Sequence, residues 1–236
     1  MDQAIPLAGG RITKGVMRVG DTVRRPASAN SGFVAELLQV LAHQGFGAAP
    51  RYLGQDDEGR DILSYLDGWV PTKFQRWTDG QVGAVGVLLR GFHDATRHSR
   101  LAARHPVICH HDVGPNNFVF RGDRPVALID FDTAEPGSPL EDLGYAAWTW
   151  CIASKYDDVD RQAAQVRVLV DAYGLAQPER DAVVDAILER QSRNVRFWVE
   201  TTVDVTEDQR ATRIAWSRRE HAFTTGNRLV FEQALT

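Results

Sequence analysis

The chain has 236 residues, of which 43% are apolar and 25% charged, and its formal net charge is −4. This composition is ordinary for a soluble globular protein and shows no basic footprint for nucleic acid or an anionic membrane. No run of about 18 or more apolar residues is present, and the start of the chain lacks the pattern of a signal peptide, so we expect no membrane span and no leader. The two cysteines, Cys109 and Cys151, cannot form a disulfide framework. We therefore expect a reducing, cytoplasmic location.

Residues 1–67 are predicted to form a small β-rich lobe. Short runs of β-type residues occur at 16–19, 22–25 and 62–66. Between the first two runs lies Gly20-Asp21, a pair whose leading glycine favours a type II′ hairpin. From Asn30 to Gly45, apolar residues recur at helical spacing, which predicts a helix packed by one face.

The rest of the chain, residues 68–236, is predicted to be mainly helical. Asp79 can cap a helix whose buried face carries Val82, Val85, Leu89 and Phe92. A brief strand at 107–109 is followed by a hairpin around Gly122-Asp123. Further helices are predicted over 158–173, from Pro178 onward, and over roughly 209–233.

Polar residues concentrate in two short segments, 109–118 and 129–132. In a regular hairpin Phe118 would pair with Ile129, and Asn117 would then lie opposite Asp130. An amide oxygen beside a carboxylate suits Mg²⁺, which takes its other ligands from water and substrate phosphates. Asp112 precedes Asn117 on the same loop, so it can face this site without joining it.

The spacing of these residues resembles a known arrangement. His110-x-Asp112-x4-Asn117 matches the kinase catalytic loop, and Ile129-Asp130-Phe131 stands where the metal-binding D-F-G is found. With Pro139-Leu140-Glu141-Asp142-Leu143, these motifs make the chain similar to the aminoglycoside phosphotransferase and choline kinase-like family, most strongly over residues 90–150. The resemblance implies an α+β, protein-kinase-like fold of two lobes. The N-terminal lobe (1–67) would cover a nucleotide, and the larger helical lobe (68–236) would hold the catalytic residues and the acceptor.

The resemblance also implies a role for each matched residue. Asp112 would accept or orient the proton of an attacking hydroxyl, while Asn117 and Asp130 would hold Mg²⁺ against the phosphates of ATP or GTP. His110 would support the loop from behind, and Asp142 would anchor its backbone. Such a site moves a γ-phosphoryl group to a small molecule by positioning and charge neutralisation.

The N-terminal lobe departs from the family pattern at its phosphate clamp. No lysine lies on the strand that should carry one, and Arg24 or Arg25 takes its place. Glu36 borders the buried face of the predicted helix and could reach inward to an arginine. An arginine fork differs from a lysine point charge, although it can also grip phosphates. The alternative is that these three charges lie on a solvated surface.

Other parts of the nucleotide site are weakly marked. The segment Leu7-Ala8-Gly9-Gly10 is the best candidate for a glycine-rich loop, but it lacks the G-x-G-x-x-G spacing. Lys14 could approach the phosphates from this side. Ser64 and Leu66 lie at the expected hinge between the lobes, where backbone groups of the family read the adenine edge.

The acceptor is predicted only as a class. Acidic and aromatic residues of the C-terminal lobe would suit a cationic hydroxyl compound, such as an aminoglycoside or an amino alcohol. The candidates are Asp132, Glu135, Glu141, Trp148, Trp150, Trp198 and Glu200. The alternative for each is a core tryptophan or a surface acid. Fold does not choose among acceptors, and the sequence does not indicate an oligomeric state.

Three other readings remain. A catalytically inactive kinase-like protein could bind a nucleotide or a partner, as the missing lysine and weak glycine loop suggest. A metal-dependent HD-type phosphohydrolase could use His93-Asp94, His98 and His111-Asp112, but the last pair follows a strand and precedes Gly-Pro, which disfavours a helix. Zinc bound by the run Cys109 to Asp112 is disfavoured, because adjacent residues on a strand point to opposite faces.

Overall fold

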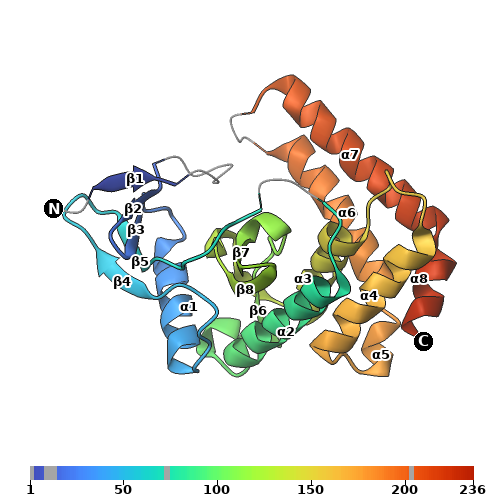
Figure 1. The fold of residues 1–236 in the computed structure, drawn as a ribbon, viewed down its shortest axis with the longest axis horizontal. Coiled ribbons are helices and arrows are strands. Elements are labelled where there is room, and N and C mark those ends of the chain that lie inside the picture. The colour runs from blue at the N-terminus through green and yellow to red at the C-terminus, as the bar shows by residue number, and fades with distance from the viewer. Residues whose placement is uncertain (1–2, 8–14, 72–74, 202–204) are drawn as a thin grey trace. The chain divides into compact units, whose positions relative to one another are not determined.

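The computed structural model describes residues 3–7, 15–71, 75–201 and 205–236. The chain divides into two compact units, one made of 1–73 and 91–137 and the other of 74–90 and 138–236. Figure 1 shows strands concentrated in the first unit and helices in the second. Within the described residues, every helix is too short or too polar to cross a membrane.

The first unit contains a five-stranded antiparallel sheet in the order β1-β2-β3-β5-β4. Its strands are β1 (Ala4–Pro6), β2 (Met17–Val19), β3 (Thr22–Arg25), β4 (Tyr52–Gln55) and β5 (Asp61–Ser64). The β2–β3 hairpin is confirmed, with Val19 opposite Thr22 and Gly20 at a φ of 57°. The sequence did not predict β1 or β4. The former has three exposed residues, and the latter holds a glycine and a bulge, so neither carries a clear β pattern.

One helix, α1 (Ser31–His43), lies beside this sheet (Figure 1). Its inward face is formed by Val34, Leu37, Leu38 and Leu41, all at most 3% exposed. These residues recur every three or four positions, so the predicted helix is confirmed. Gly45 follows with a φ of 77°, the left-handed conformation that commonly ends a helix.

The remainder of the first unit is built from short elements. They are the C-terminal turn of α2 (Asp79–Thr96), the strands β6 (Val107–Cys109), β7 (Phe118–Arg121), β8 (Arg124–Leu128) and β9 (Glu135–Gly137), and the 3₁₀ turns η1 (Arg100–Ala102), η2 (Pro115–Asn117) and η3 (Phe131–Thr133). β6 pairs with β9 and β7 pairs with β8, both antiparallel. Phe92, on α2, is fully buried and contacts Phe46 and Phe131. The apolar face predicted for this helix is thus confirmed.

The predicted register of the β7–β8 hairpin was wrong by one residue. Phe118 lies opposite Leu128 instead of Ile129, because the loop closes at Gly122-Asp123 and a bulge shifts the register between Val119 and Phe120. The backbone N–H of Ile129 consequently donates to the carbonyl of Asn117 at 2.9 Å. Asp130 is therefore outside the ladder and does not lie directly opposite Asn117.

The second unit is helical. It contains the N-terminal part of α2, then α3 (Pro139–Ala146), the π-helical turn η4 (Ala147–Cys151), α4 (Val159–Tyr173), α5 (Gln177–Arg180), α6 (Val183–Glu200), α7 (Glu207–Gly226) and α8 (Arg228–Leu235). α4 begins after Asp158 and ends at Gly174, as predicted. The helix expected from Pro178 is interrupted before α6, and the last helical region is interrupted at Asn227.

Two glycines allow the helices of the second unit to pack closely. A Cβ at Gly144, on α3, would lie 2.6 Å from the backbone of Ala186 on α6. One at Gly86, on α2, would lie 2.5 Å from the carbonyl oxygen of Leu169 on α4. Both distances are shorter than any real contact, so these positions require the absence of a side chain.

Candidate active site

The centre of the predicted site lies in the loop that joins β6 to β7. The side-chain amide Nδ2 of Asn117 donates to Oδ2 of Asp112 at 2.7 Å and to the Asp112 carbonyl at 2.8 Å. Nδ2 of Asn116 in turn donates to Oδ1 of Asn117 at 2.9 Å. Because both acceptors on Asp112 lack hydrogens, the amide nitrogen of Asn117 must face them. Its oxygen is thus directed away from the Asp112 carboxylate.

His110 supports this loop from the interior of the first unit. Its side chain is fully buried against Phe131, with the ring centroids 4.7 Å apart. Nδ1 accepts from the backbone N–H of Asp112 at 3.3 Å, so the neutral ring carries its proton on Nε2, which lies 3.0 Å from the carbonyl of Ile129. The hydroxyl of Thr133 donates to the His110 carbonyl at 2.8 Å. His110 therefore joins the loop of Asp112 to the segment around Asp130.

The backbone of Asp130 adopts a left-handed conformation, with φ 67° and ψ 65°. Few non-glycine residues adopt it, and such strain is concentrated at functional sites. Desolvation by the surrounding protein raises the pKa of the Asp130 carboxyl, although the residue as a whole is exposed at the surface. The charges of Asp132 and Asp112 raise the pKa further, while His110 and Arg25 oppose the rise. Two neighbouring carboxylates thus act on Asp130.

Arg25 connects β3 to this acidic group. It is only 7% exposed, and its guanidinium lies 2.5 Å from Oδ1 of Asp132 and 3.5 Å from Oδ2 of Asp61. Oδ2 of Asp61 also accepts from the Ser31 hydroxyl at 2.6 Å, and Asn30 donates to the Asp132 carbonyl at 2.7 Å. Of the two candidate arginines, Arg25 therefore lies beside Asp132, two residues after Asp130.

The other two candidate charges of the N-terminal lobe point elsewhere. Arg24 donates to the Thr22 hydroxyl at 2.8 Å, and its Nε lies 3.6 Å from Asp56. The Glu36 carboxylate forms an ion pair with Arg100, the first residue of η1. The arginine that Glu36 reaches is thus neither Arg24 nor Arg25.

The expected hinge residues have different environments. The Ser64 hydroxyl accepts a hydrogen bond from the backbone N–H of Arg51 at 2.8 Å, so this side chain is already engaged by the residue before β4. The backbone of Leu66 forms no hydrogen bond with any other described residue. Among the residues that the structure describes, the backbone donor and acceptor of Leu66 thus have no partner. Lys14 and the glycines of Leu7–Gly10 lie outside the described residues, apart from Leu7 itself.

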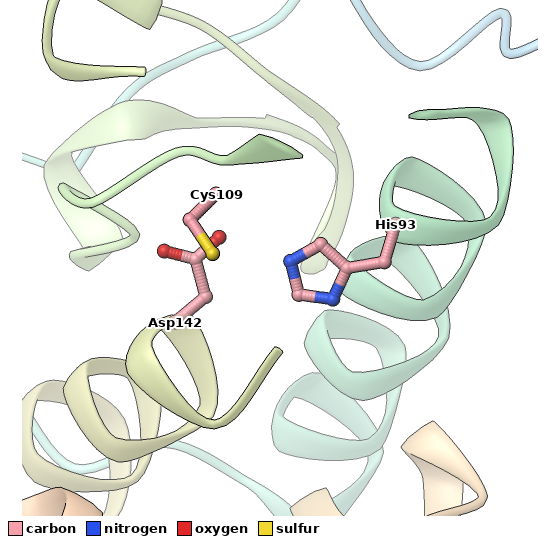
Figure 2. Close-up of side chains that lie close together, drawn as sticks. All are labelled: His93, Cys109 and Asp142. Carbon is pink, nitrogen blue, oxygen red and sulfur yellow. The ribbon is translucent and has the colours of Figure 1, made fainter. Parts of the chain in front are cut away.

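Neighbouring residues of the run from Cys109 to Asp112 point in different directions. Figure 2 shows the Cys109 thiol at the end of β6 facing the imidazole of His93 on α2. Their nearest ligating atoms lie within 4.8 Å. The His110 ring instead reaches Ile129, and His111 lies 3.8 Å from Glu135 with a φ of 63°. The ligating atoms of Cys109 and His111 lie within 4.8 Å of each other, as expected for alternate residues, but the His110 ring turns away from them. The four consecutive side chains therefore do not all converge on one point.

The candidate acceptor residues fall into separate environments. In the first unit, Asp132 pairs with Arg25 and Glu135 lies near His111. In the second, Glu141 belongs to the capping box of α3 with Ser138 and also contacts Arg193. Trp198 packs against Phe197 and carries Arg213 on its ring. Trp148 and Trp150 line a cavity of the second unit, whereas Trp198 and Glu200 do not.

Sequence reasoning missed most of the cavity wall. Trp77, Tyr156, Trp216 and Glu220 also line it. Glu220 stands on one face of α7 with the buried Ser217 and Thr224, at spacings of three and four residues. The surrounding sequence, Ser217-Arg218-Arg219-Glu220-His221, is polar on every side, so nothing in it marked that face as buried.

Comparison with known proteins identifies relatives along the whole chain. The family model described as "Phosphotransferase enzyme family" matches residues 61–184. The trifolitoxin immunity protein of Rhizobium leguminosarum bv. trifolii is 31% identical, with 99% of each chain covered. A homoserine kinase of Parvibaculum lavamentivorans is 30% identical over 71% of this chain and 50% of its own length.

Solved structures show the same fold at lower identity. A choline/ethanolamine kinase family protein from Mesorhizobium loti has a TM-score of 0.64 and 19% identity, covering 99% of this chain and 92% of its own. A microcompartment-associated aminopropanol kinase has a TM-score of 0.68 and 12% identity, covering 100% and 95%. The GDP complex of aminoglycoside 2'-phosphotransferase-IIIa has a TM-score of 0.64 and 14% identity, covering 94% of each chain. The predicted α+β, protein-kinase-like fold, with an N-terminal sheet and a helical C-terminal region, is thereby confirmed.

Proposed function

Because the chain belongs to the phosphotransferase enzyme family, we propose that it moves the γ-phosphoryl group of ATP or GTP, with Mg²⁺, to a hydroxyl group of a small molecule. The observation that carries this proposal is the hydrogen bond between Asn117 and Asp112, in a loop that His110 ties to the segment of Asp130. Each residue stands at the position of its counterpart in the kinase motif. A protein that only bound a partner would not need all of them.

The donor atoms fit a hard divalent cation. Asn117 offers an amide oxygen and Asp130 a carboxylate, the ligand types that Mg²⁺ takes from proteins. Desolvation and the neighbouring carboxylates raise the pKa of Asp130, so a cation bound beside it would favour its charged form. Asn117 and Asp130 would hold the ion. Bound there, Mg²⁺ would neutralise negative charge on the nucleotide phosphates.

Asp112 would orient the acceptor hydroxyl and take its proton. Its Oδ2 accepts from the side-chain amide of Asn117, which fixes the orientation of the carboxylate on the loop. The backbone N–H of Asp112 is fixed by His110, so His110 acts as a positioning residue. The contribution of these residues is mainly geometric, because phosphoryl transfer needs little covalent chemistry from the protein.

Arg25 is the better candidate of the two arginines for contact with the nucleotide. It is buried beside Asp132, near the proposed metal ligand, whereas Arg24 is engaged by Thr22 and Asp56. Leu66, whose backbone groups have no partner among the described residues, is the better candidate for reading the base. Both roles belong to this proposal, and nucleotide binding is the observation that tests them.

The acceptor is proposed to be a hydroxylated amine. Homoserine kinase, the choline/ethanolamine kinase family protein and the aminopropanol kinase are all named for such compounds. One related aminoglycoside phosphotransferase was solved with gentamicin. Amino alcohols and aminoglycosides share an ammonium group and a hydroxyl, so either class is compatible with the aromatic and acidic residues of the second unit.

A second candidate role is protection against a toxin. It is favoured by the trifolitoxin immunity protein, which is 31% identical over 99% of both chains. The two roles are compatible, since a phosphotransferase can act on a toxic compound. Expression of the wild-type chain in a trifolitoxin-sensitive strain tests this role, with the Asp112→Asn variant as its control. Protection by both proteins would place immunity outside the catalytic site.

Thermal unfolding with ATP or GTP, each with and without Mg²⁺, tests the primary proposal. A ligand present at about 100 times its Kd stabilises a folded protein by about 2.7 kcal/mol, which shifts the midpoint measurably. We expect a Mg²⁺-dependent shift with one nucleotide, followed by formation of ADP or GDP when an amine acceptor is added. No shift with either nucleotide at millimolar concentration would favour a catalytically inactive kinase-like protein. The family match lends no support to the HD-type hydrolase.

A further inference from the structure

Asp61 lies directly opposite Arg25 in the sheet of the first unit. Arg25 ends β3 and Asp61 begins β5, and the two residues pair in the antiparallel register of these strands. Opposed side chains lie on the same face of a sheet, close enough to interact. Oδ2 of Asp61 is 3.5 Å from Nε of Arg25, and the two side chains are only 3% and 8% exposed. The register of β3 and β5 thus brings a buried carboxylate to the arginine that is proposed to contact the nucleotide.

The carboxylate of Asp61 is fixed by contacts from two further elements. Its Oδ2 accepts from the hydroxyl of Ser31, in the first turn of α1, at 2.6 Å. Its Oδ1 accepts from the side-chain amide of Gln55, on β4, at 3.2 Å. The partial positive charge at the start of α1 also favours an anion here. Asp61 is therefore a rigid anchor, because turning its side chain would break hydrogen bonds to both neighbours.

Arg25 contacts a second carboxylate with the other end of its guanidinium. Its Nη2 lies 2.5 Å from Oδ1 of Asp132, in η3, whose side chain is 27% exposed. Asp61 thus faces the Nε edge, whereas a terminal nitrogen is directed towards the segment that also carries the proposed metal ligand Asp130. Because a guanidinium is planar and rigid, holding its Nε edge sets the direction of its terminal nitrogens. The orientation of Arg25 towards the site therefore depends on Asp61.

Glu36 does not share this work. The kinase pattern places the carboxylate partner of the clamp on a helix, and Glu36 on α1 is the candidate that the sequence offers. Its carboxylate pairs instead with Arg100. Among the residues that the structure describes, the carboxylates within ion-pair distance of Arg25 are those of Asp61 and Asp132. A carboxylate on a strand thus stands where the sequence predicts one on a helix.

We propose that Asp61 is a positioning residue, which holds Arg25 in the orientation that receives the phosphate groups of the nucleotide. The inference rests on the proposed function, because it concerns how the clamp of that site is prepared. A long arginine side chain has many rotamers, and a side chain that is ordered before binding loses less conformational entropy when the ligand arrives. The contribution of Asp61 therefore applies to the phosphates of the ligand and not to its nucleoside part.

Calorimetric titration of the full chain measures this contribution. The ligands are ATP and GTP with Mg²⁺, and adenosine and guanosine, which lack phosphates. Asp61→Asn preserves the shape of the side chain and its ability to form hydrogen bonds with Ser31 and Gln55. We expect it to weaken nucleotide binding by about 10- to 100-fold, the range for contacts of a charged group, and to leave nucleoside binding within about twofold. Equal weakening of both ligands would mean a purely structural role and would overturn the inference.

Removal of a negative charge by itself has the opposite effect on an anionic ligand. If Asp61 acted only through its charge, Asp61→Asn would strengthen nucleotide binding, most of all at low salt. An affinity that is unchanged or higher therefore counts against the inference. In an Arg25→Gln background, Asp61→Asn should cause no further loss of affinity, because its effect passes through the arginine. Losses that add in the double variant would also contradict it.

Two other carboxylates of the first unit serve as controls. Asp56→Asn is the matched change, since Asp56 follows β4 and pairs with Arg24, and it should leave nucleotide affinity unchanged. Glu36→Gln should do the same, because its carboxylate is engaged by Arg100. Weaker binding in Glu36→Gln but not in Asp61→Asn would return the role to the helix and refute the assignment of Asp61.

The outcomes separate this inference from the proposed reaction. Unfolding midpoints first establish that each variant is folded. If Asp61→Asn is not, Asp61→Glu, which keeps the charge but displaces the carboxylate by one methylene, replaces it in the same comparison of nucleotide and nucleoside. If the wild type binds a nucleotide and the variant binds it equally well, this inference is wrong and the proposed function stands. If the wild type binds neither ATP nor GTP, the proposed function fails and this inference fails with it.

Discussion

Asn117 holds Asp112 through its side-chain amide, whose Nδ2 donates to both the carboxylate and the backbone carbonyl of that residue. Asn117 is 4% exposed and lies at the end of η2, directly before β7. The proposed base and the proposed metal ligand are therefore one mechanical unit. Neither side chain can turn without breaking a hydrogen bond to the other.

Replacing Asn117 with alanine should affect both stability and activity. The change leaves a partly buried carboxylate and a carbonyl without their donor, which costs about 1–3 kcal/mol of unfolding free energy. Phosphoryl transfer should fall to background, since the metal ligand is also lost. Urea denaturation and a nucleotide-turnover assay measure the two effects. Asn116→Ala, which removes only a neighbouring donor, is the control, and an equal loss in both variants would contradict the role given to Asn117.

Asp112→Asn tests the proposed base without changing the size of the side chain. We expect transfer to fall by about 100- to 10,000-fold, the range for loss of a general base. The Mg²⁺-dependent thermal shift with nucleotide should remain, because Asp112 is not assigned to the metal. Both quantities are obtained from the same purified variant. Full turnover in this variant would show that another group accepts the proton.

The order and spacing of residues predicted which side chains share the β6–β7 loop and the segment after β8 better than they predicted the local geometry. The motif located Asp112, Asn117 and Asp130, because such spacings are fixed by the loop that carries them. The register of β7 and β8 was wrong, since it depended on a bulge that no residue type marks. The partners of Arg25 could not be predicted, because Asp61 and Asp132 are distant in sequence.

The helices, too, were predicted only in part. The strongly periodic segments that form α1, α2 and α4 were predicted because one apolar stripe defines each of them. The breaks before α6 and at Asn227 were missed, since polar residues tolerate both a helix and a turn. Glu220 was missed because its burial depends on packing between helices and not on its local sequence.

Arg25→Ala should destabilise the first unit more than any nearby surface change. It leaves the carboxylates of Asp61 and Asp132 without their shared cation, and breaking a buried pair in this way costs about 3–5 kcal/mol. Arg24→Ala is the matched control on the same strand and should cost about 1 kcal/mol or less. Chemical denaturation compares them. Similar losses would mean that the Arg25 network contributes little.

Gly144→Ala tests the close packing of α3 on α6. The added methyl group would meet the backbone of Ala186 at 2.6 Å, so the helices must separate, at a cost of about 1–3 kcal/mol. Gly32→Ala, in the first turn of α1 with open space around it, should be neutral or stabilise by up to about 1 kcal/mol. The thermal unfolding midpoint should therefore fall for Gly144→Ala, and it should stay unchanged or rise for Gly32→Ala.

Asp130→Asn should make the protein more stable at neutral pH while it abolishes Mg²⁺-dependent nucleotide binding. Burial, Asp132 and Asp112 raise the pKa of Asp130 in the folded protein above its ordinary value of 3.8. Between the ordinary and the raised pKa the folded state binds more protons than the unfolded state, so stability falls as pH rises through this window. At pH 7 the folded protein therefore carries an unfavourable charge that asparagine lacks.

The unfolding midpoints of the wild type and this variant should converge as the pH is lowered through that window, because the wild-type carboxyl then becomes protonated in both states. The measurement is made with a chelator, so that no divalent cation offsets the charge. Addition of Mg²⁺ and nucleotide should then stabilise the wild type alone. A variant that is less stable than the wild type at pH 7 with the chelator present would show that the Asp130 charge is satisfied by the protein itself, and the argument for a cation at this position would lose its electrostatic support.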